Sequence, residues 1–228
     1  MQKINYQKQL DEIIAGLEKN GGHPTLLLHS CCAPCSSYVL EYLNRYFHII
    51  LFYYNPNISP KEEFEKRTGE LKRLVEEMPM TDKPEVIVGR YEPSEFFEAA
   101  KGLEELPEGS ERCFKCYRLR LEEAAKLAKE LGADYFTTTL SISPYKNAQK
   151  LGEIAAELGE IYNVRALPAD FKKKGGYKRS IELSAQYSLY RQDYCGCVYS
   201  KAERDRKNKE KSELADKQEG EYIKLIIE

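Results

Sequence analysis

The sequence predicts an α/β fold: a mostly parallel five-stranded sheet with helices on both faces. Two observations lead to this prediction. Short apolar stretches rich in aliphatic and aromatic residues alternate along the chain with amphipathic segments of helical periodicity. The stretches are almost continuously apolar, which is typical of strands covered on both faces, as in parallel sheets. At 228 residues, the chain is long enough for one domain with a substantial core.

The N-terminal part of the chain supplies the first three strands. An initial amphipathic helix ends at the Gly-Gly-His-Pro sequence of residues 21–24, because glycine and proline interrupt helices. Strands are then expected near residues 25–30, 47–57 and 84–91, with helices near residues 36–46 and 60–78. The order is therefore strand, helix, strand, helix, strand.

The C-terminal part continues this alternation. A helix is expected from about Ser110 to Leu131, where Gly132 is well placed to terminate it. A fourth strand at residues 133–140, a helix at 148–158 and a fifth strand at 162–171 follow. We predict a single α/β domain over residues 1–228, with a cysteine-containing C-terminal extension from about residue 175.

Two loops should lie at the ligand-binding edge of this sheet. Ligands of open parallel sheets bind beyond the carboxyl ends of the strands, where the strand order reverses. The sequence HSCCAPCS (29–36) follows the first strand, and SISPYKN (141–147) follows the fourth. Both should therefore be found at the same edge.

Seven cysteines stand out in the sequence. They form the patterns C-C-x-x-C, C-x-x-C and C-x-C and are Cys31, Cys32, Cys35, Cys113, Cys116, Cys195 and Cys197. Cysteines three residues apart on the first turn of a helix point the same way, and Gly196 lets the chain turn between the last two. We predict that all seven are metal ligands.

The chemistry of thiolates narrows the choice of metal. Thiolates select zinc, copper(I) or iron–sulfur clusters. A structural zinc site needs four ligands, fewer than the seven cysteines available, so we favour iron–sulfur chemistry over zinc and over inert or redox-active thiols. Cys31 and Cys32 are adjacent, so we expect their side chains to diverge, and we place Cys113 and Cys116 on the cluster.

Composition excludes several classes of protein. No apolar segment approaches the roughly 20 residues that span a bilayer, and the polar N-terminus does not resemble a secretory signal. We therefore expect a cytoplasmic protein without a membrane partner, where thiols are kept reduced. The net charge of −2 means that contact with nucleic acid would need a local basic patch.

Four motifs together resemble the QueH-type epoxyqueuosine reductases, which complete the biosynthesis of the tRNA nucleoside queuosine. They are LHSCCAPCS, RCFKCYRLRLEEAA, FTTTLSISPYKN and YCGCVYS, and they span most of the chain. The resemblance implies a fold similar to the adenine nucleotide alpha-hydrolase group, a [4Fe-4S] cluster and a nearby second metal, which we take to be iron. It also implies reductive removal of the epoxide oxygen from epoxyqueuosine in tRNA, with tRNA and a low-potential electron donor as partners.

Further residues are candidates for catalysis and substrate binding. His29 ends the first strand beside the cysteines, so we name His29 and Cys31 as catalytic, although a structural histidine is the alternative. Hydroxyl, amide and ammonium groups after the fourth strand are expected to bind the substrate; they belong to Ser141, Ser143, Tyr145, Lys146 and Asn147. Ordinary turn and helix-cap chemistry is the alternative here.

A basic segment is the best candidate for RNA contact. In DFKKKGGYKRS, cations are interleaved with Phe171 and Tyr177, either of which could stack on an unpaired base. The expected tRNA-binding residues are Lys172, Lys173, Lys174, Tyr177, Lys178 and Arg179. A solvated basic loop is the alternative.

Two rival functions fit parts of the sequence. An ATP-using tRNA-modifying enzyme of the alpha-hydrolase type would need a glycine-rich phosphate loop after the first strand, and HSCCAPCS has no glycine. A zinc-stabilised RNA-binding module would need only a closed site of four ligands.

Overall fold

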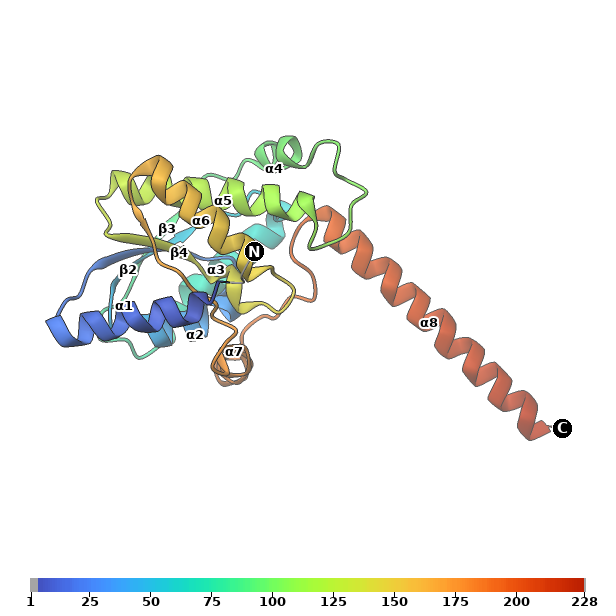
Figure 1. The fold of residues 1–228 in the computed structure, drawn as a ribbon. Helices are drawn as coiled ribbons and strands as arrows, with labels where there is room; N and C mark the ends of the chain where they lie inside the picture. Colours follow the sequence, from blue (N-terminus) through green and yellow to red (C-terminus); the bar gives the residue numbers. More distant parts are fainter. Residues whose placement is uncertain (1–3, 228) are drawn as a thin grey trace.

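The computed structural model describes the backbone of residues 4–227 and the side chains of residues 4–214. Figure 1 shows an α/β body from which the last helix projects. In chain order, the elements are α1 (Tyr6–Asn20), β1 (Thr25–His29), α2 (Ala33–Leu43), β2 (His48–Tyr53), α3 (Lys61–Glu77), β3 (Glu85–Val88), α4 (Pro93–Ala100), α5 (Glu111–Glu130), β4 (Tyr135–Thr138), the 3-10 helix η1 (Thr139–Ile142), α6 (Ala148–Tyr162), β5 (Arg165–Ala166), α7 (Gly176–Gln186) and α8 (Val198–Ile227).

The five strands form one sheet in the order β3-β2-β1-β4-β5, and every neighbouring pair is parallel. The predicted five-stranded parallel sheet is therefore confirmed. The chain winds from β1 outward through β2 to β3, then returns to the other side of β1 as β4. The strand order thus reverses between β1 and β4, and the carboxyl ends of these two strands form the expected ligand edge.

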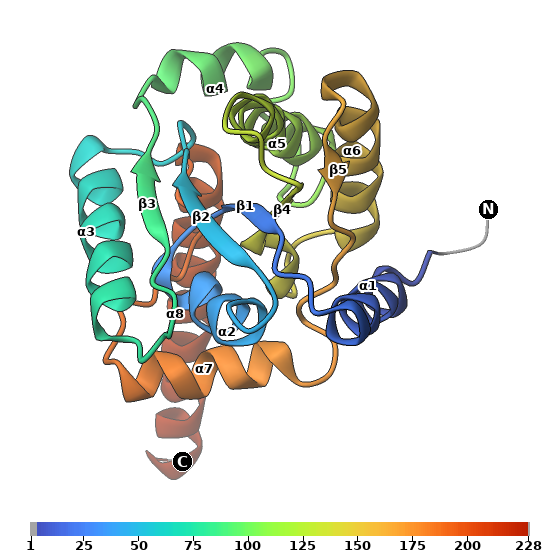
Figure 2. The ribbon, with the colours of Figure 1, turned by 90° about the vertical axis from the view of Figure 1, so that its left-hand side faces the viewer.

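Helices cover both faces of the sheet (Figure 2). One face packs against α1, α2 and α3 through a core that includes Leu26, Leu28 and Phe47. The other face packs against α5 and α6 through Leu27 and Phe136, among others. Successive β1 residues thus face opposite cores, because side chains alternate along a strand. This explains why β1 is apolar throughout.

The fifth strand is much shorter than predicted. Only Arg165 and Ala166 pair with β4, although the sequence predicts a strand over residues 162–171. The N–H of Leu167 still donates to the carbonyl oxygen of Phe136, but the carbonyl oxygen of Leu167 accepts from the side-chain hydroxyl of Thr137, and β4 itself ends at Thr138. Before the strand, Asn163 takes a left-handed conformation that ends α6.

The C-terminal part of the chain first packs on the body and then leaves it. Helix α7 lies against α2 and buries Leu183. The following loop returns to the sheet edge, and α8 begins directly after Cys197 and extends outward (Figure 1). Among the described residues, no helix combines the length and apolarity that a bilayer crossing requires.

Candidate metal centre

Three cysteines meet where β1 gives way to α2. Cys31 lies in the turn, Cys32 caps α2 in an extended conformation, and Cys35 lies on the first helical turn. Their sulfur atoms all lie within 4.8 Å of one another, and those of Cys31 and Cys32 are 3.9 Å apart. We call this group the cysteine triad. The prediction that Cys31 and Cys32 diverge is wrong, because the change from turn to extended backbone swings both sulfurs to one side.

Four other cysteines line one pocket at the same edge. Cys113 and Cys116 lie on the first turns of α5, and Cys195 and Cys197 come from the loop before α8. We call this group the four-cysteine pocket. Gly196 allows the tight turn between the last two cysteines: its φ of +114° favours glycine, and an added Cβ would lie 2.9 Å from Ile58.

Four of the seven sulfur atoms, in both groups, are contacted by hydrogen-bond donors. N–H or O–H donors lie within 3.2–3.4 Å of four sulfurs: Gly109 N–H on Cys113, Ser200 N–H on Cys197, Lys146 Nζ on Cys195, and the Thr139 hydroxyl on Cys31. Donors of this kind stabilise negative charge on sulfur, which is the form in which cysteine binds metals.

Buried cations accompany the thiols. Lys146 and Arg120 line the four-cysteine pocket, and Arg67 lies close to Cys32. Burial alone would lower the pKa of Lys146, but the Cys195 sulfur and the Glu108 carboxylate raise it well above its ordinary value. One Nη atom of each arginine is buried without a hydrogen-bond partner among the described residues. The clustered thiols, the hydrogen bonds to their sulfur atoms and the buried cations beside them fit a metal centre that is held by thiolates and carries negative charge.

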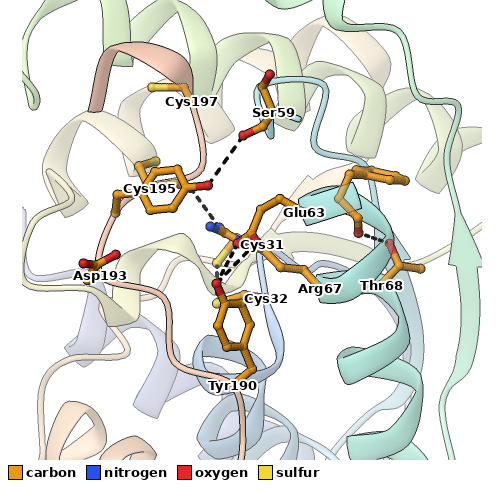
Figure 3. A network of polar contacts seen from close by, with 12 residues as sticks. Cys31, Cys32, Ser59, Glu63, Arg67, Thr68, Tyr190, Asp193, Cys195 and Cys197 are labelled. Atoms are coloured by element: carbon orange, nitrogen blue, oxygen red, sulfur yellow. Dashed lines mark hydrogen bonds and ion pairs between the residues drawn. The ribbon is translucent and has the colours of Figure 1, made fainter. Parts of the chain in front are cut away.

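Residues of α3 and of the loop before α8 make contacts near the cysteine triad that the sequence does not predict. Arg67 donates through Nε to Glu63 at 2.7 Å and through Nη1 to the carbonyl oxygen of Cys195 at 3.2 Å. The Tyr190 hydroxyl donates to the same Glu63 carboxylate, and the Arg67 guanidinium lies 5.2 Å from the Tyr194 ring (Figure 3). Arg67 is therefore the link that fixes the Cys195 loop above α3.

His29 is enclosed by its hydrogen bonds. It is 0% exposed, with Nδ1 2.8 Å from Thr138 Oγ1 and Nε2 3.0 Å from the Tyr54 carbonyl oxygen. A carbonyl oxygen only accepts, so Nε2 carries the proton and Nδ1 accepts from the hydroxyl. Burial and then the nearby charge of Arg120 lower the pKa of His29 to about 3. This geometry favours the structural alternative for His29, whereas Cys31 remains partly exposed within the triad.

The residues after β4 do not form one open binding surface. Ser141 is buried and accepts from the N–H of Phe171, Ser143 accepts from the N–H of Tyr145, and Asn147 caps α6 by accepting from the N–H of Lys150. These contacts match the turn and cap alternative. Lys146 instead points into the four-cysteine pocket, whereas the Tyr145 side chain is 75% exposed.

The basic segment is largely neutralised by carboxylates. Lys172 pairs with Asp170, Lys174 with Asp11, and Arg179 with both Glu41 and Glu182. Lys173 and Lys178 are exposed and, within the part of the chain that the structure describes, have no ion pair. Tyr177 is partly buried, and Phe171, the other aromatic residue of the segment, belongs to the core and cannot stack on a base.

Comparison with known proteins identifies related sequences over most of this chain. A family model described as Epoxyqueuosine reductase QueH matches residues 26–203, which include all seven cysteines. The epoxyqueuosine reductase QueH of Staphylococcus epidermidis is 47% identical over 203 residues, covering 87% of this chain and 85% of the relative. That of Streptococcus pyogenes serotype M1 is 41% identical, covering 87% and 79%. That of Thermotoga maritima is 37% identical, covering 82% and 95%.

Proposed function

This chain belongs to the epoxyqueuosine reductase QueH family, and from this premise we propose that its cysteines hold a [4Fe-4S] cluster and a second iron that reduce epoxyqueuosine in tRNA. The observation that carries the proposal is the gathering of seven thiols from three distant segments at the switch point of the sheet. Membership of the family makes the chain an oxidoreductase. We place the reaction in the cytoplasm, where thiols stay reduced.

The reaction defines what the site has to provide. In removing an epoxide oxygen, both C–O bonds break, a C=C bond forms between the two carbons, and the oxygen leaves as water after two electrons and two protons are taken up. Iron held by the thiols would supply electrons singly and act as a Lewis acid. The electrons come from a low-potential donor that remains to be identified.

The two cysteine groups divide naturally between two centres. The four-cysteine pocket offers the four thiolates that a [4Fe-4S] cluster takes, including Cys113 and Cys116. The cysteine triad offers three sulfurs, which would hold a single metal ion and would leave it able to act as a Lewis acid on the substrate. We therefore assign the cluster to the pocket and the second iron to the triad.

The chain's own residues prepare the site for this chemistry. Lys146, Gly109, Ser200 and Thr139 hold the sulfurs in place with hydrogen bonds. Tyr145 lies one residue from Lys146 and exposes its ring to solvent, so it can stack on an unpaired base of the anticodon loop. Lys173 and Lys178 remain candidates for contact with phosphates.

The decisive experiment uses the full chain, purified without oxygen. We expect it to contain iron and sulfide, and to remove one oxygen from epoxyqueuosine-containing tRNA when dithionite is supplied. Digestion of the tRNA and mass spectrometry of its nucleosides measure that loss. Stoichiometric zinc without iron would instead favour a non-catalytic RNA-binding module.

A further inference from the structure

Arg120 carries a positive charge in the interior without a carboxylate partner. It lies on α5, is 2% exposed, and belongs to none of the ion pairs formed by the described residues. Its Nε donates to the carbonyl oxygen of Cys116 at 3.3 Å and its Nη1 to Asn55 Oδ1 at 3.2 Å. Its Nη2 is buried and has no hydrogen-bond partner among the residues that the structure describes.

The other buried cations of the site are different. Arg67 is paired with Glu63 at 2.7 Å, and Lys146 with Glu108 at 2.6 Å. Arg120 lines the four-cysteine pocket, where Glu108 is already paired with Lys146, so the groups left to balance its charge are the cysteine sulfurs, which lose their protons when they bind a metal. A buried charge without a counter-charge is strongly unfavourable, so the fold needs negative charge on these sulfurs.

Arg120 also connects the two cysteine groups. Arg120 lines the four-cysteine pocket, where its Nε donates to the backbone carbonyl oxygen of Cys116. Asn55, which accepts from Arg120, donates through Nδ2 to the carbonyl oxygen of Ser30 at 2.9 Å, directly before Cys31. The guanidinium is therefore fixed between the pocket and the triad.

We propose that Arg120 is the fixed counter-charge shared by both metal-binding cysteine groups. This inference rests on the proposed function and adds a positioning residue to it. A fixed positive charge beside the sulfurs favours a centre that carries net negative charge. It also favours the reduced form over the oxidised form, because reduction adds another negative charge.

Three variants test the charge of Arg120. R120M removes the charge and keeps a long side chain, R120K keeps the charge without the planar fork, and R118M is the matched control. Arg118 lies on the same helix, but it is partly exposed and pairs with Glu157. Each protein is reconstituted anaerobically with iron and sulfide. Iron affinity, reduction potential and urea unfolding of the metal-free protein are then measured.

R120M should bind iron at least about tenfold more weakly and have a lower reduction potential. R120K and R118M should stay close to the parent protein in both. Metal-free R120M should be no less stable than the metal-free parent, since an uncompensated buried charge has gone.

Three results would overturn the inference. They are unchanged iron affinity and potential in R120M, a loss of iron from R120K as severe as in R120M, or iron loss from R120M that merely follows unfolding of its metal-free form. Should R120M fail to fold, R120K still decides, because only a charge-based role lets lysine retain the iron. Absence of iron from the parent protein would instead overturn the proposed function.

Discussion

The cysteine edge and the basic segment of residues 170–179 both looked like functional sites in the sequence, yet the fold treats them differently. At the sheet edge, sulfurs from three segments converge and receive hydrogen-bond donors. In the basic segment, three cations form ion pairs with carboxylates. Lys172 pairs with Asp170 of the same segment, Lys174 with α1, and Arg179 with α2 and α7. The tertiary structure thus brings the cysteines together, whereas it pairs most of the basic residues with separate carboxylates.

The difference follows from the partners that each side chain can find. The chain has 37 acidic residues, so an exposed lysine or arginine readily finds a carboxylate. A cysteine thiol has no such common partner in a reducing compartment, and its grouping is harder to explain without a metal. Clustered cysteines are therefore a stronger signal than clustered lysines in this chain.

Replacing one pocket cysteine should have the largest effect. Cys116→Ser is expected to remove cluster iron and to lower epoxyqueuosine reduction by at least about 100-fold, because serine is a poor ligand for iron in such clusters. Iron analysis and nucleoside mass spectrometry measure both effects. Lys115→Ala, at the exposed neighbouring position, is the control and should keep its iron. Full iron content in Cys116→Ser would contradict the proposal that the cysteines of the pocket bind the cluster.

Replacing His29 should mainly affect stability. His29→Ala leaves the Thr138 hydroxyl and the Tyr54 carbonyl without their buried partner, so we expect a loss of about 3 kcal/mol in the free energy of unfolding. Urea unfolding of the metal-free protein measures it. The exposed His48, paired with Asp82, is the control, and His48→Ala should cost less than about 1 kcal/mol. A stable His29→Ala protein that binds iron but cannot reduce substrate would restore the catalytic role.

The smallest effect is expected in the basic segment, where it sharpens the comparison. Replacing Lys173 and Lys178 by alanine should weaken tRNA binding a few-fold and reduce its salt dependence by roughly one unit of slope per lysine. Replacing Lys172 and Lys174, which are paired, should change both less. Binding titrations at several salt concentrations separate the two pairs. A larger effect from the paired lysines would show that RNA displaces their carboxylates.

The sequence by itself determined the alternation of strands and helices, because hydrophobic periodicity is local. It also placed HSCCAPCS (29–36) and SISPYKN (141–147) at one sheet edge, since the carboxyl ends of parallel strands share an edge. It could not give the length of β5, which depends on how far this edge segment keeps its backbone hydrogen bonds to β4.

Only the tertiary structure decided how the cysteines divide into a triad and a pocket. It also decided that Lys146 and Arg120 line the four-cysteine pocket, while Lys172, Lys174 and Arg179 pair with carboxylates. In the sequence these five residues are equivalent cations. Most of the groups beside which they lie, such as Cys195 for Lys146, Asp11 for Lys174 and Glu41 for Arg179, come from distant parts of the chain, and electrostatic energy depends on distance in space.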